Sequence, residues 1–224
     1  MKNLTILIGV IFLITGCIGE DVIDDRVDER VVVDNLISEL KVGDTYQFEI
    51  TFFNNVGKVE DANVTWTSSN PTVISVASNG LAEALTEGMS QISVVANDNV
   101  KYEFSVEAGS ETVAMENPDE RTGTIKTTSS YTLEGDFSLA KIDGALVLQL
   151  ANNFKATSAL PGLFAYLSNN PSSISGAYEI GEVKVFSGAN TMSVASSVGI
   201  MDYSHVVYFC KPFNVKVGDG KMSN

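Results

Sequence analysis

Polar and apolar residues alternate with a period of two over most of the chain after residue 31. The alternation is clear at 46–52, 91–94 and 102–106, where aromatic and branched side chains are separated by Gln, Glu, Ser or Thr. This pattern is typical of strands with one buried face. Turn signals separate these segments, among them Asn79-Gly80, a pair that tolerates positive φ. Residues 32–107 are therefore predicted to form a β-sandwich of short strands.

The second half of the chain repeats the pattern without a convincing amphipathic helix. Leu146, Leu148 and Leu150 alternate with Val147 and Gln149 after the turn Asp143-Gly144. Further strands are predicted at 163–167, 178–186, 206–210 and 215–217. Residues 108–119 are small, polar and contain proline, which indicates a linker. The fold class is therefore all-β, with a second sandwich or barrel over 120–224.

The N-terminus carries a short apolar run, from Leu4 to Ile14, that ends in Ile14-Thr15-Gly16-Cys17. The run has the length of a signal-peptide core and is too short to span a bilayer. The motif resembles the lipobox of bacterial lipoproteins. The resemblance implies a signal peptide over 1–16, cleavage before Cys17, and a lipid on Cys17 that makes the membrane a partner. The alternative is an ordinary signal peptide with a chance cysteine.

Residues 17–31 are rich in Asp, Glu and Arg, and they are predicted to form an acidic, solvated tether. Residue 18 is not Asp, which argues against retention in the inner membrane. Acidic residues after the cysteine resemble the surface-export signal of Bacteroidetes lipoproteins. We therefore expect a lipid-anchored protein of the bacterial envelope, at the outer membrane, and leave open whether it faces the periplasm or the cell surface.

The charge balance narrows the range of partners. The chain has 28 acidic and 14 basic residues and a net charge of −14. Such a charge disfavours nucleic acid as a partner.

One block of the first half is more specific than its periodicity. Val64-Thr65-Trp66-Thr67-Ser68-Ser69-Asn70-Pro71 continues into Val73-Ile74-Ser75-Val76 and then Asn79-Gly80. It resembles the bacterial Ig-like domain of group 2. The resemblance implies that Trp66 is the buried core aromatic. It also implies that the domain is a spacer, or an adhesive module for an envelope polymer or a partner protein.

The second half resembles the DM13 family. The motifs are Tyr131–Leu139, Pro161–Ser168 and Tyr178–Val183, and the most diagnostic is the stretch Tyr203–Val215 around Cys210. Two positions depart from the family pattern, because Leu163 stands where an acidic residue is common and Val217-Gly218 replaces Phe-Gly. The resemblance implies electron transfer with a redox partner protein. Its cysteine is then a bare redox thiol or a ligand to a prosthetic group such as haem.

Cys210 has three open interpretations. It is a redox or ligand thiol, a buried structural cysteine, or a partner in an intermolecular disulfide. Alternation along 206–210 places Cys210 on one face with Val206 and Tyr208, and His205 on the other face, so a Cys-His pair within this strand is not expected. Lys211 follows Cys210 and is expected to point to the opposite face.

Other chemistry has little support in the sequence. His205 is the one histidine, which excludes a multi-histidine zinc centre, and no metal site is predicted. No Gly-x-Ser-x-Gly elbow accompanies Asp202, so hydrolase or transferase activity is not expected, and whether the protein is an enzyme stays open. No cofactor is predicted; for haem, Met192, Met201 and His205 are second ligands by type alone. The two functional hypotheses are electron transfer through Cys210, and a non-enzymatic adhesion or ligand-binding module in which Cys210 is structural.

Overall fold

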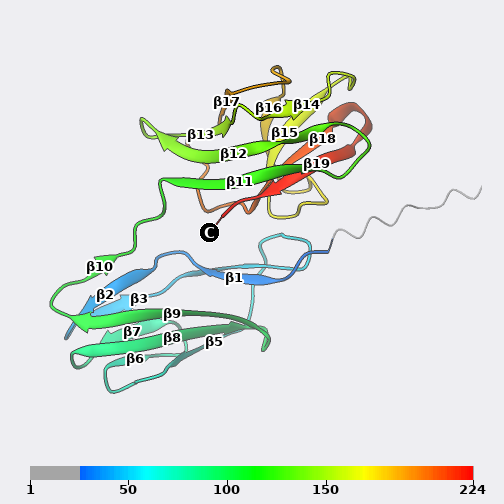
Figure 1. Cartoon of the computed structure of the whole chain (residues 1–224). Coiled ribbons are helices and arrows are strands. Elements are labelled where there is room, and N and C mark those ends of the chain that lie inside the picture. The colour runs from blue at the N-terminus through cyan, green and yellow to red at the C-terminus, as the bar shows by residue number, and fades with distance from the viewer. Residues whose placement is uncertain (1–25, 224) are drawn as a thin grey trace, which may run out of the picture.

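The computed structural model describes residues 26–223, so Cys17 and the predicted signal peptide lie outside the described residues. The described chain is all-β, as the sequence predicted, and contains one short 3₁₀ turn. Figure 1 shows two β domains in sequence order. Within residues 26–223 no helix is long and apolar enough to cross a membrane.

The first domain contains ten strands in three small sheets. The sheet orders are β1-β4, β10-β2-β9-β8-β5 and β3-β7-β6, with β2 and β9 parallel. The strands are β1 (Arg30–Val33), β2 (Ile37–Lys41), β3 (Thr45–Gln47), β4 (Ile50–Phe53), β5 (Val64–Ser68), β6 (Ile74–Val76), β7 (Leu81–Ala84), β8 (Gly88–Ala96), β9 (Val100–Gly109) and β10 (Val113–Ala114). The alternating apolar residues of these strands face one common core.

Trp66 lies in that core, as the resemblance implied. Its indole is 6% exposed and stacks on the ring of Phe48, with 5.6 Å between ring centroids. Gly80 precedes β7 with φ of +85°, and an added Cβ would lie 3.0 Å from Trp66 Nε1. Glycine is therefore needed at this turn both for its backbone conformation and for the close approach of Trp66.

The second domain is a nearly closed barrel of one nine-stranded sheet. The order is β16-β15-β18-β19-β11-β12-β13-β17, with β14 paired to β12. The elements are β11 (Glu120–Thr127), β12 (Leu133–Ile142), β13 (Ala145–Leu150), β14 (Lys155–Ala156), β15 (Leu163–Ser168), β16 (Tyr178–Glu182), β17 (Asn190–Ser193), β18 (His205–Cys210), the 3₁₀ turn η1 (Lys211–Phe213) and β19 (Val215–Lys221). Near the seam between β16 and β17, the Ala195 amide donates to the Tyr178 hydroxyl at 2.9 Å.

Side chains fill the interior of this barrel. Phe154 comes from the loop after β13 and is fully buried among Leu, Ile and Val side chains of the sheet. Gly135 on β12 has φ of +136°, and an added Cβ would lie 2.5 Å from Phe154 Cα. The loop can therefore approach the sheet closely only because residue 135 has no side chain.

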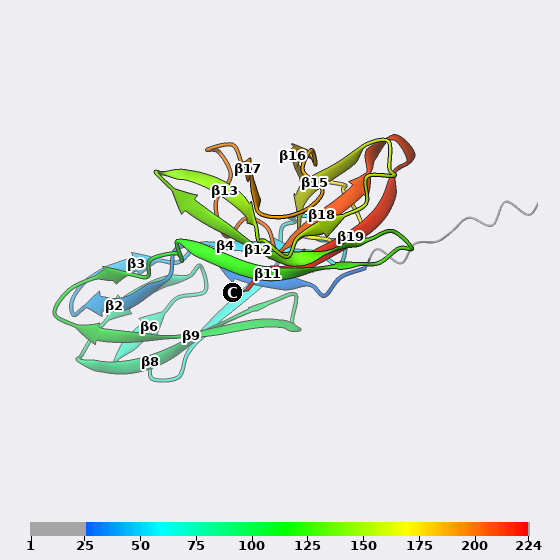
Figure 2. The same cartoon turned by 45° about the horizontal axis from the view of Figure 1, so that its top comes forward.

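The two domains meet along a polar contact. Figure 1 shows β1, and Figure 2 shows β4, on the side of the first domain that faces the barrel. Arg30 donates to the side chain of Asn169, and Asn170 Nδ2 donates to the Val56 carbonyl at 3.1 Å. Part of the segment expected to be a linker is ordered strand, because β9 extends to Gly109 and β10 pairs with β2.

Candidate functional site

Cys210 is the last residue of β18, and its thiol is 1% exposed. Val206 and Tyr208 share its face and pack into the same core, whereas Val207 and Phe209 pack into a separate outer cluster with Tyr166. The strand alternation predicted from the sequence is therefore confirmed. Reactive cysteines usually sit in exposed, electropositive surroundings, and the native surroundings of Cys210 are neither.

Cys210 lies at the end of β18, directly before an exposed turn. Cys210 pairs with Leu163 and Val215, and η1 begins at the next residue. The Lys211 amide donates to the Gly162 carbonyl at 3.0 Å, and an added Cβ on Gly162 would lie 3.2 Å from Pro212 Cδ. All three residues of η1 are exposed, and Phe213 is 67% exposed. Cys210 is thus one residue from a solvent-facing turn.

Lys211 does not face the thiol. Its Nζ lies 2.7 Å from Glu179 Oε2 and 4.7 Å from the centre of the Phe164 ring, on the outer side of the sheet. The hydrogen bond from Lys211 lowers the pKa of Glu179. The cation nearest to Cys210 in sequence is therefore engaged elsewhere in the closed structure.

Tyr208 shares the inner face of β18 with Cys210 and is fully buried. Its hydroxyl has no hydrogen-bond partner among residues 26–223, and its ring lies 6.4 Å from that of Phe154. Burial raises the pKa of Tyr208 well above its usual value, so the phenol is neutral. A buried hydroxyl without a partner is uncommon in a packed core.

His205 begins β18, at the opposite end from Cys210. Cys210 lies five positions after His205, which is roughly 16 Å along a strand. The His205 Nδ1 atom lies 2.8 Å from the Ser204 hydroxyl. Burial lowers the pKa of His205 to about 4, against a smaller opposing effect of Asp219. The structure therefore keeps His205 and Cys210 apart, as the alternation predicted.

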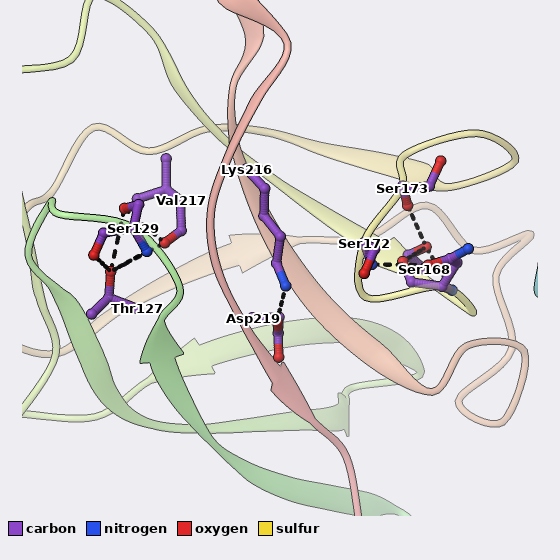
Figure 3. A network of polar contacts seen from close by, with 9 residues as sticks. Thr127, Ser129, Ser168, Ser172, Ser173, Lys216, Val217 and Asp219 are labelled. Carbon is purple, nitrogen blue, oxygen red and sulfur yellow. Dashed lines mark hydrogen bonds and ion pairs between the residues drawn. The ribbon is translucent and has the colours of Figure 1, made fainter. Parts of the chain in front are cut away.

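Hydrogen bonds and an ion pair stabilise the ends of the strands around this core (Figure 3). Lys216 and Asp219 form an ion pair within β19. Ser129 Oγ donates to the Val217 carbonyl at 3.1 Å, which fixes the turn after β11 to β19. The buried Ser168 hydroxyl donates to the Asn170 and Ser173 carbonyls at 2.8 and 3.0 Å. These bonds shape the loop that reaches the first domain.

A cavity of about 760 Å³ lies between the two domains. We call it the interdomain cavity. The first domain contributes residues of β1, β4, β9 and the loop at 57–59, and the second contributes residues at 169, 175–176 and 201–203. Aromatic and acidic side chains from both domains line it, namely Phe53, Tyr102, Tyr203, Asp34 and Asp202. Pockets of this size between domains are common ligand sites.

Hydrogen bonds hold both acidic side chains of the interdomain cavity. Asp34 follows β1 and accepts a hydrogen bond from Thr51 at 2.9 Å. Asp202 accepts from the Gly199 amide at 2.6 Å. Burial raises the pKa of Asp34, and the negative charges of Glu49 and Asp202 add to this effect. Across the described residues, neither carboxylate forms an ion pair.

The fold and these contacts define a two-domain all-β protein, an Ig-like sandwich joined to a barrel. The model of the bacterial Ig-like domain (group 2) matches residues 29–106, and the model of electron transfer DM13 matches residues 124–222. The chain therefore contains a group 2 bacterial Ig-like domain followed by a DM13 domain, as the motifs predicted.

Other comparisons are weaker. The solved structure of domains 1–6 of the surface layer protein SbsC is similar to this chain at 9% identity with a TM-score of 0.30. The match covers 89% of this chain and 40% of that one. No curated protein matches the chain.

The structure separates the candidate residues into distinct places. Cys210 lies inside the barrel wall, and Met192 and Met201 pack at the periphery of the same core. No group of three or more His, Cys, Asp or Glu within residues 26–223 is placed to hold a metal ion. The interdomain cavity was not expected from the sequence, because its walls come from strands and loops of two domains that lie far apart in the chain.

Proposed function

We propose that this protein is lipid-anchored in the bacterial envelope and that its Ig-like domain presents a DM13 domain active in electron transfer. The order of the two domains supports this proposal, since the Ig-like domain stands between the tether and the DM13 domain. The lipobox-like motif supports an anchor at Cys17. The anchor is tested by replacing Cys17 with Ser, which should abolish lipid labelling and leave unprocessed precursor; normal processing would exclude the lipoprotein assignment.

Cys210 is the proposed redox thiol, and its access to a partner is gated. A buried thiol cannot meet a partner's disulfide until the chain around it opens. The exposed turn η1 directly follows Cys210, and we infer that displacement of this turn and of the residues after it exposes the thiol.

The number of cysteines in the chain determines which reaction Cys210 can carry out. The chain has two cysteines, and the proposed lipid occupies Cys17. Cys210 therefore reacts with sulfur from outside the chain. Its thiolate attacks a disulfide, forms a mixed disulfide, and releases the other sulfur as a thiolate. The electrons come from a dithiol protein. One of its thiolates attacks Cys210 Sγ and releases the partner's remaining sulfur as a thiolate, and its other thiolate then closes a disulfide and releases the Cys210 thiolate, so two electrons pass from the dithiol to the partner's disulfide.

The experiment uses the full chain purified in detergent. The protein is incubated with oxidised glutathione under native conditions, and Cys210 is examined by mass spectrometry and the protein by absorption spectroscopy. We expect a glutathione adduct on Cys210 that a reductant removes, and none in Cys210→Ser. A native protein that never forms the adduct, or a spectrum that reveals a bound prosthetic group, would overturn the gated-thiol proposal.

The second candidate is a non-enzymatic adhesion or ligand-binding module with Cys210 as a structural residue. Two observations favour it: the thiol is 1% exposed in an apolar core, and the interdomain cavity lies at the other end of β18. In that case Cys210 reacts only when the whole domain unfolds. Cys210→Ala would then cost about 1 kcal/mol of stability and leave the function intact.

A further inference from the structure

The lining of the interdomain cavity favours a positively charged ligand. Asp34 comes from the first domain and Asp202 from the second, so a carboxylate stands on each wall. Lys58 is the lining cation, and it forms no ion pair within the described part of the chain. Both carboxylates therefore face the cavity region without a neutralising partner, in a chain whose net charge is −14.

The rest of the lining is apolar and aromatic. Phe53 belongs to β4, Tyr102 to β9 and Tyr203 to the loop before β18, while Val59 is 69% exposed at the rim. An aliphatic chain can pack against such surfaces, and an ammonium group is attracted to the faces of aromatic rings. An anionic ligand would instead meet two carboxylates at a cost.

The cavity is held open by contacts that its own residues make. Asn169 accepts from Arg30 of the first domain and donates to the Asp202 carbonyl at 2.8 Å. Gly57 faces Asn169 so closely that an added Cβ would lie 2.7 Å from its carbonyl oxygen. Hydrogen bonds from Thr51 and Gly199 position the carboxylates of Asp34 and Asp202, one from each domain, before any ligand arrives, which reduces the entropy lost on binding.

We propose that the interdomain cavity binds an aliphatic amine with two or more ammonium groups, held between Asp34 and Asp202. The carbon chain lies against Phe53, Tyr102 and Tyr203. Burial is the main cause of the raised pKa of Asp34, with smaller contributions from Glu49 and Asp202, and a bound cation would favour the charged carboxylate. This site is separate from Cys210 and does not depend on the redox proposal.

The test is calorimetric titration of the full chain in detergent with 1,6-diaminohexane, using 1,6-hexanediol as the neutral probe of equal length. We expect saturable binding of the diamine that weakens as salt rises, and no binding of the diol. Asp34→Asn and Asp202→Asn should each weaken diamine binding by about tenfold. Both substitutions keep a side-chain oxygen for the hydrogen bonds from Thr51 and Gly199.

The matched control is Asp143→Asn, which removes the same charge from an exposed turn residue with φ of +51°, a conformation that Asn tolerates. This variant and Cys210→Ser should bind the diamine as the original chain does. The proposal is overturned if the diamine does not bind, if the diol binds equally well, or if Asp143→Asn weakens binding as much as Asp34→Asn.

Discussion

Burial of the Tyr208 hydroxyl inside the barrel lowers the stability of the folded protein. Its hydroxyl is buried without a partner in the described chain, so the core loses the hydrogen bonds that water supplies to the unfolded state. Burial of the Cys210 thiol on the same face has no comparable cost in stability, because a thiol packs as a small apolar group. The two residues on this face of β18 therefore differ in what they contribute to stability.

Replacing Tyr208 with Phe removes only that hydroxyl. We expect the variant to be more stable by about 1 kcal/mol in urea unfolding, because the unsatisfied group is gone and the ring keeps its contacts. Tyr131→Phe is the control, since Tyr131 is 39% exposed and should show no change. A loss of stability in Tyr208→Phe would mean that the hydroxyl is bonded to an internal water or ligand.

Arg121 stabilises the barrel by joining elements that are distant in sequence. It is 4% exposed on β11, and it donates to the Ser223, Ile200 and Tyr203 carbonyls at 2.7, 3.0 and 2.6 Å. These bonds tie the first strand of the domain to its C-terminus and to the loop that lines the interdomain cavity. Burial lowers the pKa of Arg121, although the group stays charged.

Arg121→Met removes these bonds and leaves three carbonyls without their donor. We expect a loss of about 3 kcal/mol in the free energy of unfolding. Arg121→Lys keeps the charge but cannot reach all three acceptors. Its free energy of unfolding in the same denaturant titration should therefore lie between those of the original chain and Arg121→Met. Equal stability of Arg121→Met and the original chain would show that these hydrogen bonds make no net contribution to the free energy of unfolding.

His205, at the start of β18, is expected to make the stability of the folded protein depend on pH. His205 has a pKa lowered from 6.5 to about 4, so the unfolded chain binds its proton more readily than the folded chain does. Its contribution to stability is complete above pH 6.5 and is lost as the pH falls toward 4. The charges around it are Asp219, Lys221, Arg30 and Lys216, and burial outweighs them.

His205→Gln isolates this effect. The stability gap between the original chain and the variant should shift against the original chain between pH 7 and pH 4.5, measured by urea unfolding at each pH. Asp136 and Glu179 have lowered pKa values, so their titration falls mostly below this interval. Parallel pH profiles for the two proteins would show that His205 is not held neutral by the fold.

The strands show what periodicity can and cannot predict. β13, β15 and β18 have apolar residues at each inward position, and the sequence placed them within one or two residues. β11 was not visible as a strand, because its inward positions hold Arg121, Gly123 and Ile125. Gly123 is small because Phe137 and the Lys221 carbonyl occupy the space beside it. A buried cation and a glycine thus hide the alternation.

At the scale of the whole molecule, each domain has its own apolar core, and the contact between them is polar. The sequence predicted two domains from composition and motifs. It could not predict the interdomain cavity, because Asp34 and Asp202 are far apart in the chain and only the docking of two folded domains brings them together. The burial of Cys210 was one of three open interpretations, and strand alternation favoured it.

A fragment that begins at Glu120 tests whether the barrel folds alone. It loses the hydrogen bonds between Asn169 or Asn170 and the first domain, but it keeps its core intact. We expect cooperative thermal unfolding with the near-ultraviolet signal of packed aromatic residues. A fragment without such a transition would mean that the domains share one folding unit.

The central claim is that Cys210 is a gated redox thiol. The most direct test is the rate at which a thiol reagent modifies Cys210 in the native protein at increasing, sub-denaturing concentrations of urea. Local opening of the turn after β18 exposes little surface, so the account predicts labelling that depends weakly on urea and exceeds the rate allowed by global unfolding. Labelling that follows urea with the full slope of global unfolding would contradict the claim and identify Cys210 as a structural core residue.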